Sequence, residues 1–209
     1  MKIDGEYLFN GPREEVWEII RDPEVLATAL PGTKSLDKVR ENEYQGEMNI
    51  RVGPVGGLFS GHLVVSNEIP PASLTMTVDG RGSPGFINGA GNVALNDQGD
   101  GTTLMKYDGE VQIGGKLASV GQRLLDTASK STIRQGLEAL DVALQARVTA
   151  KSEGRAVEYT PPSESEFVAA VAKDMAGQML SSRTVWIIIA IIVILAFVAV
   201  IWISRAHGG

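Results

Sequence analysis

The chain of 209 residues contains no cysteine and only two histidines, His62 and His207. The lack of cysteine excludes disulfides, a thiolate nucleophile and cysteine-based metal sites, although it does not fix the redox compartment. His62 has no second histidine near it in the sequence with which to share a metal ion or build a catalytic triad. We therefore name no catalytic residue and expect no metal site.

An excess of basic charge is also lacking. Residues 1–150 hold 14 Lys and Arg against 20 Asp and Glu, which accounts for the whole net charge of −6. An acidic domain is poorly suited to nucleic acid or to electrostatic docking on anionic lipid. The carboxylates of Asp108 and Glu110 share an outward strand face and are expected to be a solvated pair. We expect no nucleic-acid partner.

A secretory signal is missing from the first residues, MKIDGEYLFNGPREE, which contain no apolar stretch. In contrast, all 19 residues of segment 185–203 are apolar. As a helix this segment would be about 28 Å long, close to the ~30 Å hydrocarbon core of a bilayer. We predict a single tail anchor at residues 183–205, with the N-terminal domain in the cytoplasm, on the inner (cytoplasmic) membrane. The predicted interface residues are Arg183, Trp186, Trp202 and Arg205.

Hydrophobic periodicity predicts one domain at residues 1–150. A first strand shows alternation over residues 3–9, and two short helix starts follow at Pro12 and Asp22. Alternating strands with short turns fill residues 34–114, and a long amphipathic helix is predicted at 116–150. These elements predict an α+β fold, in which a curved antiparallel sheet of about seven strands wraps around the long C-terminal helix.

The inward faces of these elements combine apolar side chains with tyrosines and glycines, which suits a cavity for a lipophilic ligand. Gly46, Gly109 and Gly121 remove volume, and Gly121 is expected inside the long helix. A fully packed core is the alternative. Phe59 and Phe86 are candidates for the cavity mouth, with ordinary core positions as their alternative. The predicted cavity residues are Tyr44, Met48, Ile50, Leu63, Leu74, Met76, Val78, Tyr107, Val111, Leu117, Val120, Gly121 and Leu124.

Residues beyond the domain divide into short segments. Segment 151–165 lacks periodicity and contains Pro161 and Pro162, so it is predicted to be a flexible linker. Segment 166–182 is predicted to be a juxtamembrane amphipathic helix that either extends the anchor or contacts lipid or protein. Residues 206–209 form a short tail after the anchor.

Four segments in order resemble the family of the G subunit of carbon monoxide dehydrogenase. They are FNGPREEVWEIIRDPEVLATALPG at 9–32, VGPVGGLFSG at 52–61, GRGSPGFINGAG at 80–91 and GTTLMKYDGEVQIGGKLASVGQRLL at 101–125. The resemblance covers about residues 1–148 and implies a helix-grip (START-like, SRPBCC) fold with an apolar cavity. It also implies association with a molybdenum-containing CO dehydrogenase or a related hydroxylase, and transport of a quinone between that enzyme and the bilayer.

Three functions remain open from the sequence. The first is a non-catalytic, membrane-anchored accessory protein that binds a quinone non-covalently and links a molybdenum hydroxylase to the lipid bilayer. The second is a small cyclase-like or hydratase-like enzyme, for which Tyr44 and Tyr107 are the inward acid/base candidates. The third is a scaffold that recruits a partner to the membrane without binding a ligand.

Overall fold

The computed structural model describes residues 1–153. The predicted linker, juxtamembrane helix, anchor and tail lie outside these residues, except that 151–153 continue the last helix. Among the described helices, none has the length and apolar character needed to cross a bilayer.

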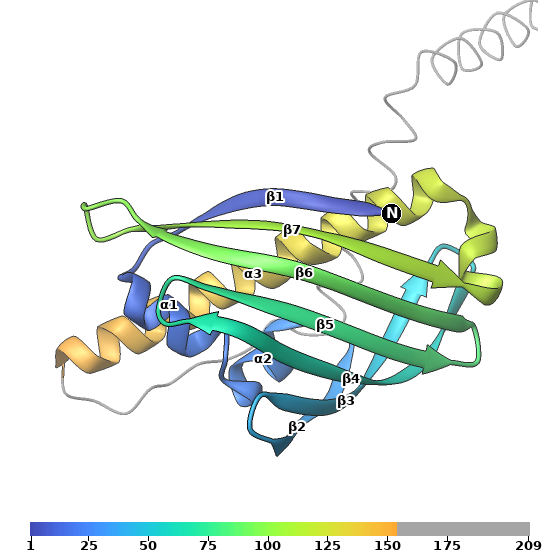
Figure 1. Ribbon diagram of the computed structural model, residues 1–209, viewed down its shortest axis with the longest axis horizontal. Coiled ribbons are helices and arrows are strands. Elements are labelled where there is room, and N and C mark those ends of the chain that lie inside the picture. Colours follow the sequence, from blue (N-terminus) through green and yellow to red (C-terminus); the bar gives the residue numbers. More distant parts are fainter. Residues whose placement is uncertain (154–209) are drawn as a thin grey trace, which may run out of the picture. The chain divides into compact units, whose positions relative to one another are not determined.

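Seven antiparallel strands form one curved sheet, in the order β1-β7-β6-β5-β4-β3-β2 (Figure 1). Strand β5 is central, and β1 and β2 are the two edges. The seven strands and their antiparallel pairing confirm the prediction from alternation. The strands are β1 (Lys2–Phe9), β2 (Thr33–Arg40), β3 (Glu43–Val52), β4 (Val55–Ile69), β5 (Ser73–Gly82), β6 (Gly85–Asp97) and β7 (Thr103–Gly114).

Two short helices follow β1, as predicted: α1 (Arg13–Ile19) and α2 (Pro23–Ala29). Asp22 begins α2, because its Oδ1 accepts hydrogen bonds from the backbone N–H groups of Glu24 and Val25, at 3.0 and 3.3 Å. Pro23 occupies the first turn, where its missing N–H costs nothing.

The predicted helix at 116–150 is divided in two. A 3₁₀ segment, η1 (Gly115–Val120), precedes the long helix α3 (Gln122–Glu153). Gly121 separates them with a φ of +93°, a conformation that residues with a side chain rarely adopt. The prediction that Gly121 lies inside a helix is therefore wrong. It is exposed, and a Cβ placed on it would meet nothing within 4 Å.

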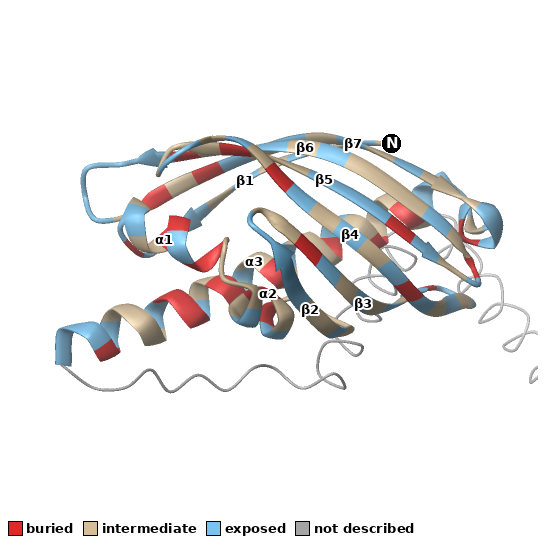
Figure 2. Ribbon diagram, turned by 60° about the horizontal axis from the view of Figure 1, so that its bottom comes forward, coloured by how far each residue is buried: buried red, intermediate tan, exposed pale blue. Residues whose placement is uncertain are grey.

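Helix α3 lies under the concave face of the sheet, and α1 and α2 cover one end (Figure 2). We call the face toward α3 the inner face. Its core consists of two clusters. Cluster 1 joins α1, α2 and the C-terminal half of α3 to the sheet through Phe9, Tyr44, Leu74 and Leu144, among others. Cluster 2 lies at the other end and contains Val52, Phe59, Leu117, Leu125 and Ala128.

Candidate functional site

Between the two clusters the inner face is incompletely covered. Val78 belongs to the central strand β5, yet it is 41% exposed. Register places it on the inner face, between Leu63 of β4 and Gly89 of β6. Within residues 1–153, Met48, Val78 and Val111 belong to neither cluster. A central strand packed tightly against a helix would bury such a valine, so solvent reaches the space between sheet and helix here.

Small residues on both walls account for this space. On α3, the buried residues between Ala128 of cluster 2 and Ala139 of cluster 1 are Ser131 and Gly136, and Gly136 faces Leu30 at the end of α2. On the sheet, a Cβ added to Gly80 would meet nothing nearer than the carbonyl oxygen of Ile87, at 3.7 Å. The fully buried positions of α3 in this stretch are therefore small, and the larger Ile133 and Leu137 are only half-buried.

The other inner-face glycines have a different role from the predicted one. A Cβ on Gly46, Gly61 or Gly109 would lie 2.5, 2.6 or 2.7 Å from a backbone carbonyl oxygen of the neighbouring strand. No real side chain tolerates such contacts, so these positions require glycine because the strands approach each other closely in a strongly curved sheet. Gly46 and Gly109 thus allow the strands to curve. They are not needed to make room for a ligand, as the sequence had suggested.

The predicted cavity residues fall into three groups. Tyr44, Leu74 and Leu117 are fully packed core residues, and the Tyr44 hydroxyl donates to the carbonyl oxygen of Arg21 at 3.3 Å. Val78 is exposed within the space and Gly121 is exposed at the end of η1. The remaining residues are half-buried: Leu63, Met76 and Tyr107 pack against cluster 1, Ile50, Val120 and Leu124 pack against cluster 2, and Met48 and Val111 belong to neither.

The two residues predicted for the cavity mouth lie in different places, and neither lies at a cavity mouth. Phe59 is buried in cluster 2 and is an ordinary core residue. Phe86 lies on the outer face, paired with Arg81 and Gly114, and is 40% exposed. Its ring covers Gly114, where a Cβ would lie 2.1 Å from a ring carbon. Because successive strand residues alternate between faces, Ile87, and not Phe86, points toward α3. The structure therefore places Phe86 away from the cavity.

A pocket of about 280 Å³ lies at the edge of the inner face, between the start of β1 and the first half of α3. Ile3 and Ile133 are among its apolar lining residues, and Ser129, Lys130 and Tyr107 are among the polar ones. Only Tyr107 was predicted as a site residue. Strand alternation already puts Ile3 inward, and helical spacing does the same for Ile133, but nothing in the sequence shows that the β1 edge and α3 leave a pocket between them.

Tyr107 extends from β7 across the edge strand β1. Its ring lies over Gly5, where a Cβ would come within 2.4 Å of the hydroxyl oxygen. Burial, with a smaller contribution from the negative charge of Asp4, raises the pKa of Tyr107 above its usual value. The phenol is therefore protonated at neutral pH, so it has a proton to donate in a hydrogen bond.

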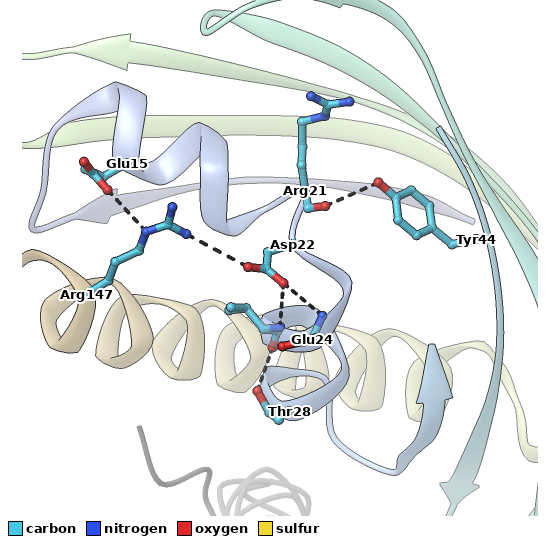
Figure 3. A network of polar contacts seen from close by, with 8 residues as sticks. Glu15, Arg21, Asp22, Glu24, Thr28, Tyr44 and Arg147 are labelled. Carbon is cyan, nitrogen blue, oxygen red and sulfur yellow. Dashed lines mark hydrogen bonds and ion pairs between the residues drawn. The ribbon is translucent and has the colours of Figure 1, made fainter. Parts of the chain in front are cut away.

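Ion pairs fasten the closed end of the inner face (Figure 3). Arg147 of α3 places Nε 3.4 Å from a carboxylate oxygen of Glu15 in α1, and Nη1 4.0 Å from Asp22 at the start of α2. Lys151 also pairs with Glu15. Both short helices are thereby tied to α3. The incompletely covered part of the inner face lies beyond cluster 1, around Val78.

Metal chemistry has no evident site in the described part of the chain. Across residues 1–153, no group of three or more His, Asp or Glu side chains is arranged to hold a metal ion. His62 is exposed on the outer face, where it pairs with Gln45 and Asp79. Asp108 and Glu110 are likewise exposed, as predicted.

A curved antiparallel sheet over a long C-terminal helix, with two short helices after the first strand, defines a START-like protein. A START superfamily protein from Mycobacterium smegmatis superposes with a TM-score of 0.55 at 13% identity, over 69% of this chain and 97% of that one. The Zhui aromatase/cyclase from Streptomyces sp. R1128 gives 0.54 at 13%, over 72% and 97%. At this identity the likeness shows the fold alone.

The chain belongs to the CoxG family, that of the G subunit of carbon monoxide dehydrogenase, which matches residues 5–145. A conserved protein from Geobacillus kaustophilus is 30% identical, with a TM-score of 0.67, over 69% of this chain and 95% of that one. That protein consists almost wholly of the matched part, so in that relative the matched part folds without a further domain. A search of curated proteins gives no match.

Proposed function

We propose that this chain is a non-catalytic accessory protein that binds a lipophilic molecule between its sheet and α3. The ligand is a quinone, and the protein links a molybdenum-containing oxidoreductase of the CO dehydrogenase type to the membrane through the anchor predicted at residues 183–205. Membership of the CoxG family supports the partner, and the START-like fold supports an apolar ligand site.

The observation that carries the ligand site is the exposure of Val78. A valine on the inner face of a central strand, flanked by two packed clusters, contacts solvent in the absence of ligand. Burying its exposed surface and that of the half-buried Met76 and Val111 against an apolar molecule is favourable, at roughly 25 cal/mol per Å². An apolar ligand would complete the core in the place where the protein itself leaves it incomplete.

Filling this space tests the site. Val78→Phe places a larger side chain in it and is expected to weaken the binding of pyrene-labelled decane to residues 1–153 about tenfold or more. The matched control is Val64→Phe, because Val64 is 38% exposed but lies on the outer face of β4. Fluorescence titration gives the two affinities, and thermal melting shows whether both variants are folded.

Equal affinities for the two folded variants would contradict this site. The identity of the ligand is tested separately, by organic extraction and mass spectrometry of the full chain purified from a host membrane. A quinone recovered with the parent chain and reduced in Val78→Phe is the expected result. A ligand-free parent chain, or one that carries only phospholipid, would overturn the assignment to quinone.

A further inference from the structure

Ile3, which lines the pocket beside β1, lies on the same inner face of the sheet as Val78. One row of paired residues runs from Ile3 through Gly109 and Gly91 to Met76. The neighbouring row runs from Val111 through Gly89 to Val78. Gly109 and Gly91 place no side chain between Ile3 and Met76, whereas in the neighbouring row Val111 stands beside Gly89. The pocket therefore lies at the end of a glycine row that leads along the inner face to Met76.

The chemistry of the pocket differs from that of the space around Val78. Lys2, Tyr107, Ser129 and Lys130 line it, and all four side chains carry hydrogen-bond donors. Within residues 1–153, no hydrogen bond or ion pair occupies these four groups. The Tyr107 hydroxyl is the most informative of them, because it is partly removed from water by burial and still lacks a partner.

Two carboxylates, Asp4 and Asp126, also line the pocket and balance the two lysines in charge. Asp126 already accepts a hydrogen bond from the Gln122 side chain at 2.7 Å. Asp4 lies close enough to Tyr107 to act on the phenol electrostatically, but it accepts no hydrogen bond from it. Besides these carboxylates the pocket therefore offers four donor side chains without a partner in residues 1–153, next to the apolar side chains of Ile3 and Ile133.

We propose that this pocket binds the polar end of an amphipathic ligand through oxygen atoms that accept hydrogen bonds from Tyr107, Ser129 and Lys130, while the apolar body of the ligand extends along the glycine rows toward Met76 and Val78. The head group is a carbonyl or a carboxylate, which share acceptor oxygens. This assignment rests on the proposed function, because it requires that the inner space receives an apolar molecule.

Three probes with one apolar body and different heads test the assignment on residues 1–153. They are pyrene-labelled decanoic acid, its methyl ester and pyrene-labelled decane. The acid, the ester or both should bind about fivefold or more tightly than the hydrocarbon, because each hydrogen bond adds roughly 1 kcal/mol. Preference for the acid over the ester, lost in Lys130→Gln, identifies a carboxylate head, and equal binding of the two identifies a carbonyl head.

Tyr107→Phe should reduce this preference for an oxygen-bearing head about fivefold and leave the affinity for pyrene-labelled decane unchanged. Tyr7→Phe is the matched control, because Tyr7, like Tyr107, is a partly buried tyrosine with a raised pKa that packs against cluster 1, but it does not line the pocket. Lys106→Gln, on the exposed outer side of β7, is the control for Lys130→Gln.

The two proposals fail in different ways. If all three probes bind equally and Tyr107→Phe changes nothing, the pocket does not hold the head group, although the apolar site remains. If Tyr7→Phe has the same effect as Tyr107→Phe, the preference does not arise in this pocket. If none of the probes binds the parent domain, the proposed apolar site itself is overturned.

Discussion

At the scale of single residues, glycines decide the shape of the inner face, and they do so in two ways. Gly61 and Gly80 are paired on β4 and β5, so they occupy neighbouring places in the same sheet. A Cβ on Gly61 would lie 2.6 Å from the carbonyl oxygen of Asp79, whereas a Cβ on Gly80 would meet nothing nearer than 3.7 Å. One glycine is required by the curvature of the sheet and the other borders open space.

This contrast predicts different effects of two substitutions. Gly61→Ala should destabilise residues 1–153 by about 2 kcal/mol, because the backbone must move to accept the methyl group. Gly80→Ala should be neutral or stabilise by up to about 1 kcal/mol, since the methyl group fits and the unfolded chain loses freedom. Urea denaturation measures both. A loss for Gly80→Ala as large as that for Gly61→Ala would mean that the space beside Val78 is filled.

At the scale of elements, short helices depend on contacts at their ends. Helix α2 has only seven residues, too few to be stable alone, and it begins at Asp22. The same carboxylate caps two backbone N–H groups of α2 and lies 4.0 Å from the guanidinium of Arg147 in α3. Its cap and its ion pair are both expected to hold α2 in place.

Two substitutions separate the cap from the ion pair. Asp22→Ala removes both and should cost about 1 kcal/mol of unfolding free energy, most of it from the cap. Asp22→Asn keeps a capping oxygen and removes the charge, so it should cost at most about 0.5 kcal/mol, because the pair is long and partly exposed. Urea denaturation distinguishes them. If Asn were as costly as Ala, the ion pair with Arg147 would be the more important contact.

At the scale of the whole molecule, the charge of the domain and the apolar C-terminal segment indicate that the segment, and not the domain, attaches the chain to a membrane. The net charge of −6 lies in residues 1–150, so the domain has little electrostatic attraction to anionic lipid. Attachment to a bilayer is then expected from residues 183–205 alone, where 19 consecutive apolar residues occur. In a chain with this division, the domain would have little attraction of its own for anionic lipid head groups.

Vesicle flotation tests this division of roles. The full chain should float with phosphatidylcholine vesicles, and a chain lacking residues 183–209 should stay in solution. Adding anionic phosphatidylserine should not recruit the shortened chain, because both surfaces are negative. Flotation of the shortened chain with either lipid would show that the domain itself binds the bilayer and would contradict the prediction.

Much of the fold was predictable from the sequence because apolar residues recur at the spacing typical of each element, two in strands and three to four in helices. Alternation predicted the strands, and Pro12 and the Asp22-Pro23 pair predicted the starts of the short helices. The division at Gly121 was missed because η1 and α3 share one apolar pattern, and the φ of +93° that separates them is a backbone property with no hydrophobic signature. Phe86 was misplaced because the glycine-rich segment around it obscures the alternation that would have placed it outward.

The sequence by itself determined the acidic domain, the absence of cysteine chemistry, the order of strands and helices and the apolar C-terminal segment, since all of these depend on composition or on neighbours along the chain. Only the tertiary structure decided which apolar residues fill the core and which surround a space. Tyr44 and Val78 are indistinguishable as inward strand residues, yet one is packed and the other is 41% exposed. The difference depends on which side chains lie opposite each residue in the folded chain, and no local sequence pattern carries that information.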